Sequence, residues 1–111
     1  MNETISRYEK LLAQHPTNEL ARFSLGKAWF DLGQFAKAKE HLEFALARKP
    51  DWMVVQIVIG KCELSLGRTD RALEAFRRAR QLAIDQHHEG PLQEMEELIA
   101  SLEEAGPKRC D

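Results

Sequence analysis

Few side chains in this 111-residue sequence have the types and spacing that chemistry requires. Cys62 lies inside an apolar stretch and is expected to be a small buried hydrophobe, whereas Cys110 has no histidine or second cysteine near it. His87 and His88 are adjacent, but no third ligand follows at a useful spacing, so we expect a solvated linker there rather than a metal site. The cysteines and histidines therefore predict neither a metal centre nor a disulfide.

The charged clusters also lack the surroundings of a catalytic or nucleic-acid site. The acidic stretches EMEEL and LEEAG come without a nucleophile or oxyanion donors, and they fit the solvated face of a helix. A basic cluster is interrupted by acidic residues and has no interleaved aromatics, so it too is expected to face solvent. That cluster consists of Arg68, Arg71, Arg77, Arg78 and Arg80. With no phosphate loop and no triad in the sequence, we expect a protein that is not an enzyme, uses no cofactor and binds no nucleic acid.

Composition and length limit the remaining possibilities. The chain has 43% hydrophobic and 31% charged residues, and its formal net charge of −2 gives no overall attraction to nucleic acid or an anionic membrane. The length allows one domain with a modest core, and the residue types favour helix. The longest apolar run is far too short to span a bilayer, and the first ten residues are polar. We therefore expect a cytoplasmic protein without a membrane partner.

One nine-residue segment occurs twice in the chain in similar form. LGKAWFDLG at residues 25–33 returns 34 residues later as IGKCELSLG at residues 59–67. In each copy apolar residues recur at helical spacing before the second glycine, and a second periodic stretch follows at residues 35–48 or 69–83. Small residues at matching positions would let two helices approach closely. They are Gly26, Ala38 and Ala45 in the first copy and Gly60, Ala72 and Ala79 in the second. Each copy therefore predicts an antiparallel helical hairpin.

A 34-residue period with small residues at these positions resembles the tetratricopeptide repeat family, TPR. The first unit, residues 19–52, matches the family pattern at Leu25, Gly26, Ala38, Ala45 and Pro50, with Trp29 where tyrosine is common. The second unit, residues 53–86, matches at Gly60, Ala72, Phe76 and Ala79. Polar residues replace aromatic ones of the pattern at Arg22, Gln56 and Glu63, and Ile84 replaces a proline. Two units in the same register make the resemblance specific.

Both ends of the chain fit the same architecture. Pro16 lies 34 residues before Pro50, so residues 2–15 are interpreted as the second half of a truncated repeat. Residues 91–105 predict an amphipathic capping helix that stops before Gly106 and Pro107, since a solenoid needs a polar outer face at each end. The resemblance thus implies an all-α fold, a right-handed α-solenoid of about six helices. A single domain is expected over residues 1–106, with a flexible tail at 107–111.

The resemblance implies that the first helix of each hairpin lines a concave groove, which receives an extended or helical peptide. On that helix, an apolar stripe with one lysine lies beside the core stripe in both repeats. It consists of Leu20, Phe23, Lys27 and Phe30, and of Val54, Ile57, Lys61 and Leu64. The family's carboxylate clamp is absent, because its positions hold Phe23, Lys27 and Val58. We therefore expect a non-catalytic module that binds a peptide or amphipathic helix of an unidentified partner protein.

The sequence leaves two alternatives open. Neighbouring helices and the capping helix could instead cover the stripe inside a short solenoid. The stripe could also pair with a second copy of the chain, so a homo-oligomerising structural module, such as a homodimer, is the alternative function. The repeated Lys27 and Lys61 favour the groove, because two cations on an apolar floor suit an acidic side chain or a peptide C-terminus.

Overall fold

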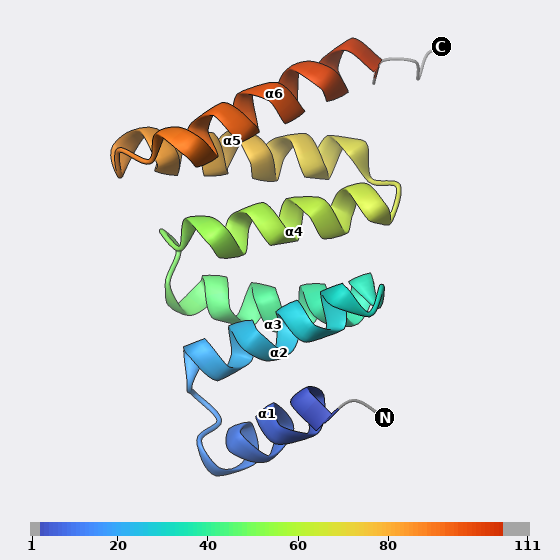
Figure 1. Cartoon of the computed structure of the whole chain (residues 1–111), viewed down its shortest axis with the longest axis vertical. Helices are drawn as coiled ribbons and strands as arrows, with labels where there is room; N and C mark the ends of the chain where they lie inside the picture. Colours follow the sequence, from blue (N-terminus) through green and yellow to red (C-terminus); the bar gives the residue numbers. More distant parts are fainter. Residues whose placement is uncertain (1–2, 106–111) are drawn as a thin grey trace.

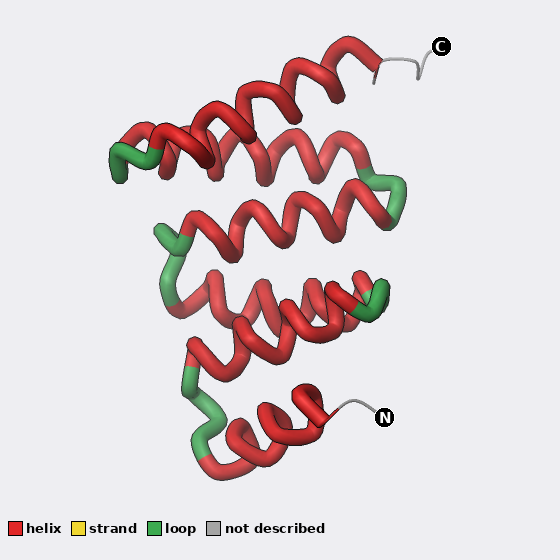
Figure 2. The backbone as a smooth tube through the Cα atoms, in the orientation of Figure 1, coloured by secondary structure: helices red, strands yellow, loops and turns green. Residues whose placement is uncertain are grey.

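The computed structural model describes residues 3–105, and within that range the chain forms six α-helices and no strand (Figure 1). They are α1 (Glu3–Gln14), α2 (Glu19–Asp31), α3 (Phe35–Arg48), α4 (Met53–Ser65), α5 (Thr69–Asp85) and α6 (Glu89–Ala105). Each helix packs on the next one along the chain, and α2 also contacts α4. Short loops join them (Figure 2), and the helices stack into an elongated array of 47 × 32 × 20 Å. The predicted all-α architecture is confirmed.

Both hairpins turn at a glycine whose backbone lies in the left-handed region. Gly33 has a φ of 80° and Gly67 a φ of 81°, values that residues with a side chain adopt only at a cost. The amide that follows Gly33 donates to the Trp29 carbonyl at 2.9 Å, and the amide that follows Gly67 donates to the Glu63 carbonyl at 2.8 Å. These hydrogen bonds satisfy carbonyls that the helix end would leave without a partner. The two glycines therefore end α2 and α4, as the repeat predicts.

The turn between α5 and α6 uses the same hydrogen bond with a histidine in the place of glycine. His87 has a φ of 58°, and the His88 N–H donates to the Ala83 carbonyl at 2.9 Å. Both histidine side chains are exposed. The linker expected here is thus a tight helix-ending turn, in which His87 holds a conformation that favours glycine.

Two helix boundaries differ from the prediction. α5 continues to Asp85 instead of ending at residue 83, and α6 begins at Glu89 rather than at Pro91. Pro91 fits inside the first turn of α6 because amides there have no carbonyl partner within the helix. The residues interpreted as a truncated repeat contain α1. The predicted helix stop and tail after residue 105, which include Cys110, lie outside the described residues.

Small residues set the distance between paired helices. The alanines at these crossings are fully buried: Ala38, Ala45, Ala72 and Ala79. A Cβ added at Gly26 would lie 2.9 Å from Leu42 Cγ, and one added at Gly60 would lie 2.5 Å from Phe76 Cε1. Neither position has room for a side chain unless its neighbour moves. The predicted close approach is confirmed, although Gly60 meets the ring of Phe76 rather than Ala72.

The core runs along the array as three clusters that share helices. The first joins α1 to α2, the second joins α2 and α3 to α4, and the third joins α4 and α5 to α6. Cys62 is fully buried in the second cluster, which confirms the prediction of a small buried hydrophobe. In the third cluster Met95 and Ile99, on the predicted apolar face of α6, are buried in the core. None of the described helices combines the length and apolar character needed to cross a membrane.

Candidate functional site

The predicted stripe on α2 is partly open to solvent. Leu20 is 65% exposed, and the three stripe residues that follow it on the helix are half-buried. The ring centroid of Phe23 lies 5.1 Å from that of Trp52, which precedes α4, and the ring centroid of Phe30 lies 5.5 Å from that of Phe35 on α3. Aromatic pairs in tilted or edge-to-face geometry attract each other. α2 therefore presents one open leucine beside two half-buried rings, each packed on a second aromatic ring.

The stripe on α4 is more covered than expected. Val54 is 44% exposed, but Ile57 is only 8% exposed and Leu64 is half-buried. Ile57 belongs to the cluster that also contains Met95 and Ile99 of α6, and Leu64 packs against that cluster. The open position expected for Ile57 is therefore corrected: α6 packs over this part of α4 and makes the isoleucine a core residue. Val54 stays accessible near the start of α4.

Both lysines of the stripe have a carboxylate partner in the chain. The Lys27 Nζ lies 3.0 Å from Asp31 Oδ1 on the same helix, and the Lys61 Nζ lies 3.3 Å from Glu94 Oε2 of α6. The four side chains are between 41% and 60% exposed, so solvent screens these pairs and each adds little to stability. The two cations are therefore paired rather than free, but a ligand carboxylate can exchange for either partner at small cost.

Two residues of this surface were not predicted. Trp52 supports Phe23 from the loop before α4, and Glu94 reaches Lys61 from the face of α6 that was assigned to solvent. The only sequence signal for Trp52 is an aromatic residue next to the repeat boundary. The position of Glu94 depends on how α6 rotates on α5, which periodicity alone does not fix.

The reactive residue types are not arranged for catalysis in the described part of the chain. Burial raises the pKa of the Cys62 thiol to about 11, so the thiol is protonated at neutral pH and is a poor nucleophile. Burial, with the nearby Arg22 cation, lowers the pKa of His41, whose Nδ1 lies 3.4 Å from Arg22 Nη1. No three metal-ligating side chains come together among residues 3–105.

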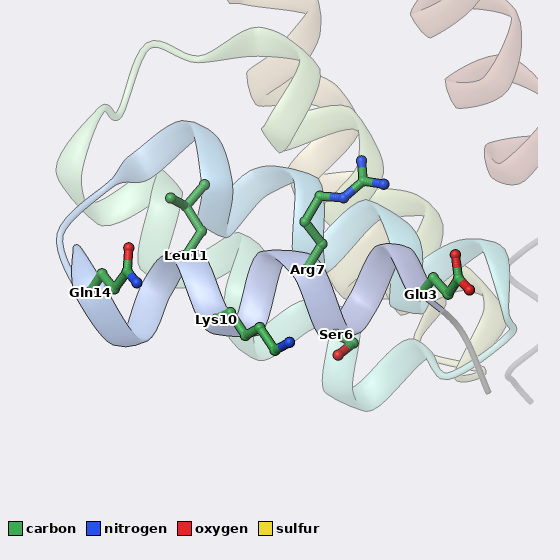
Figure 3. A pocket seen from close by; sticks show the side chains of 6 residues that line it. All are labelled: Glu3, Ser6, Arg7, Lys10, Leu11 and Gln14. Atoms are coloured by element: carbon green, nitrogen blue, oxygen red, sulfur yellow. The ribbon is translucent and has the colours of Figure 1, made fainter.

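A hollow of about 660 Å³ lies along α1 (Figure 3). The described residues that line it are Glu3, Ser6, Arg7, Lys10, Leu11 and Gln14. All of them come from one helix, and Figure 3 shows Arg7 and Leu11 on one side of α1 and Lys10 and Ser6 on another. Walls from a single helix do not enclose a ligand, so we do not place the functional site there.

Comparison with known proteins decides the family. One family model described as a tetratricopeptide repeat matches residues 1–56, and a second model with that description matches residues 30–87. The chain belongs to the tetratricopeptide repeat family. This confirms the resemblance found in the sequence, and the two matches together cover residues 1–87.

Several known proteins are similar to this chain. The TPR repeat-containing protein PA0015 of Pseudomonas aeruginosa is 33% identical over 72 residues, which make up 65% of this chain and 69% of that protein. The solution structure of BPP2914 from Bordetella parapertussis has 28% identity and a TM-score of 0.84, over 95% of this chain and 91% of that one. The crystal structure of PcrH in complex with the chaperone binding region of PopD has a TM-score of 0.86 at 19% identity, over 93% of this chain and 78% of that one. PcrH therefore shares the fold of this chain.

Proposed function

We propose that this TPR protein is a non-catalytic interaction module that binds a peptide or amphipathic helix of a partner protein. The binding surface, called here the leading-helix face, is the accessible part of the predicted stripe on α2 and α4. It consists of Leu20, Phe23, Lys27, Phe30, Val54, Lys61 and Leu64. Ile57 lies beneath it in the core.

The observation that carries the proposal is the repeated exposure of large apolar side chains on this face. Leu20 and Val54 occupy equivalent positions 34 residues apart, and they are 65% and 44% exposed. Exposed apolar groups that recur on one face indicate a surface that a partner covers. The half-buried rings of Phe23 and Phe30 extend the apolar surface along α2.

The charges beside this surface suit an amphipathic partner. A partner helix can lay its apolar face on Leu20, Phe23 and Val54, while its acidic side chains replace Asp31 at Lys27 and Glu94 at Lys61. PcrH, which has the same fold, was solved in complex with the chaperone binding region of PopD, a partner protein. That complex supports a protein partner for this fold. The residues named above indicate that this partner presents apolar and acidic side chains.

The test is capture from the native cytosol, the compartment that the composition favours, with a matched pair of charge substitutions. A variant that combines Leu20→Glu with Val54→Glu should remain folded, because both side chains are already exposed, and should lose the captured partner. Ile84→Glu, at a side chain of α5 that is 45% exposed, is the control and should keep the partner. If the double variant melts like the parent and still captures every partner, the leading-helix face is not the binding site.

A second copy of the chain is the alternative occupant of the same face, because the apolar residues that would receive a partner helix could also pair with themselves. Sedimentation velocity over a series of protein concentrations distinguishes the two occupants. A parent protein that stays monomeric at high concentration supports a separate partner. A dimer that dissociates in the double variant assigns the face to self-association.

A further inference from the structure

A second groove lies on another side of α4, between α3 and α5. Figure 1 shows α3 and α5 behind α2 and α6, with α4 between the two pairs. Two adjoining hollows of about 540 and 330 Å³ form the groove. The lining residues they share are Glu43, Leu46, Gln56 and Arg78. We call it the trailing-helix groove, since α3 and α5 are the second helices of their repeats.

This groove is separate from the leading-helix face. Its floor on α4 is made of Gln56, Ile59 and Glu63. At 3.6 residues per turn, those positions lie roughly 150° around the helix from the stripe of Val54, Ile57, Lys61 and Leu64. A ligand in one groove therefore does not compete with a ligand on the other face.

The centre of the floor holds a buried amide oxygen without a hydrogen-bond partner among the described residues. Gln56 is only 6% exposed, and its Oε1 is buried with no hydrogen-bond partner among the described residues. The neighbouring buried carboxylate of Glu63 is satisfied, with Lys39 Nζ at 3.0 Å and Arg68 Nη1 at 3.4 Å. A buried polar group without a hydrogen bond lowers stability, and an apolar side chain of similar size would avoid that cost. The amide of Gln56 therefore has the properties of a group kept for a ligand.

Two arginines stand on the α5 wall of the groove. Arg71 and Arg78 are exposed, and no carboxylate within 4.0 Å pairs with either of them in the described part of the chain. They are seven residues apart on one helix, a rise of about 10.5 Å. In a polyproline II peptide, residues i and i+3 lie on the same side at a spacing of about 9.3 Å. Carboxylates three residues apart in an extended segment therefore match the two guanidinium groups.

We propose that the trailing-helix groove binds an extended, acidic segment of a partner protein. One peptide unit of the segment hydrogen-bonds the Gln56 amide, which offers a donor and an acceptor and can turn about its terminal torsion. Two carboxylates of the segment pair with Arg71 and Arg78. The lining on α3 extends from Lys39 to Ala47, a rise of about 12 Å, which is the length of roughly four residues of extended chain.

The groove also contains acidic side chains, and their effect on the binding of an acidic segment can be measured. Glu43 lies 3.9 Å from Lys39 and is partly compensated, whereas Glu74 stands on the α5 wall between the two arginines. Glu74 repels an acidic segment, so its removal should strengthen binding. This sign is opposite to the effect of losing an arginine. Non-specific attraction of an acidic peptide would also weaken when Arg80, outside the lining, is lost, so the comparison of Arg78 with Arg80 distinguishes a site from general attraction.

Fluorescence anisotropy of two labelled peptides tests the proposal. The acidic probe is a fluorescein-labelled peptide of sequence AEPAEA, and the control probe is AKPAKA with the same label. The parent protein should bind the acidic probe and not the basic one. Arg78→Gln should weaken binding about fivefold, the upper end for losing an ion pair of an exposed side chain. Arg80→Gln, on the same helix but outside the lining, should change affinity less than twofold, and Glu74→Gln should raise affinity.

Gln56→Leu separates a ligand role from a structural one. It should abolish binding of the acidic probe while the melting temperature stays the same or rises, because it removes a buried amide oxygen that has no hydrogen-bond partner among the described residues. A lower melting temperature together with unchanged binding would assign Gln56 to the fold and overturn its role in the site. Equal binding of the two probes, no binding of either up to millimolar protein, or full affinity in Arg78→Gln would overturn the proposal. The double variant of Leu20 and Val54 should bind the acidic probe normally, so failure of the proposed function does not affect this test.

Discussion

Gly60→Ala tests the close approach of α4 and α5 at the level of one methyl group. The added Cβ would lie 2.5 Å from Cε1 and 2.7 Å from Cδ1 of Phe76, both shorter than a carbon contact allows. Phe76 is fully buried in the cluster that also holds Met53 and Met95, so its ring cannot move into solvent. The clash must be relieved by shifting the two helices apart.

Two opposing terms set the size of the effect. Alanine is favoured over glycine in a helix by about 1 kcal/mol. Inserting a methyl group into a packed core costs about 1–3 kcal/mol, and the contact at Gly60 is close enough to place it at the upper end of that range. We therefore expect the free energy of unfolding to fall by about 1–2 kcal/mol and the melting temperature to fall by roughly 4 °C or more.

Urea and thermal denaturation followed by circular dichroism measure this effect. Gly26→Ala should cost less, because its nearest contact is Leu42 Cγ at 2.9 Å, on an aliphatic side chain that can shift. Gly90→Ala is the control, since no atom lies within 4 Å of a Cβ added at that position in the first turn of α6. If Gly60→Ala is as stable as Gly90→Ala, the helix packing described for the second repeat is wrong.

Three further predictions concern polar residues. Glu63→Gln should lower the free energy of unfolding in urea by about 2 kcal/mol, because it leaves the ammonium of Lys39 without its buried carboxylate; no loss would contradict the buried ion pair. His87→Gly should raise that free energy by about 1 kcal/mol, because glycine has no steric penalty at a φ of 58°; equal urea midpoints would contradict the strain. The pKa of His41 is lowered by burial and by the Arg22 cation, so the unfolded chain binds more protons below about pH 6.5. Stability should therefore be constant well above that pH and fall as the pH drops through about 6.5 toward the lowered pKa of the folded state; His41→Gln should reduce this slope, and an unchanged slope would remove His41 as its cause.

The features that the sequence predicts well are those that local spacing determines. Gly33 and Gly67 end their helices because a left-handed backbone at that point favours glycine. Gly26 and Gly60 mark the crossings because the partner helix lies within three ångströms of an added Cβ. The 34-residue period repeats both constraints, so helix number, order and pairing can be read from it.

The features that were missed depend on contacts between distant parts of the chain. Val54 and Ile57 lie on the same stripe, and only the rotation of α6 decides that one is exposed and the other buried. In the sequence, Glu63 only replaces an aromatic residue of the repeat pattern. Its role as an ion-pair partner is not visible there, because Lys39 is 24 residues away on α3. Gln56 also interrupts that pattern, and only the packing of α3, α4 and α5 shows that its Oε1 is buried without a partner among the described residues.

Amide chemical-shift mapping determines whether a partner protein binds the leading-helix face. The measurement is a titration of ¹⁵N-labelled protein with the partner segment obtained by capture, followed residue by residue. Our account predicts that the largest shifts fall on α2 and the start of α4, at Leu20, Phe23, Lys27 and Val54. Shifts confined to α3 and α5, or an unchanged spectrum at saturating partner, would contradict it.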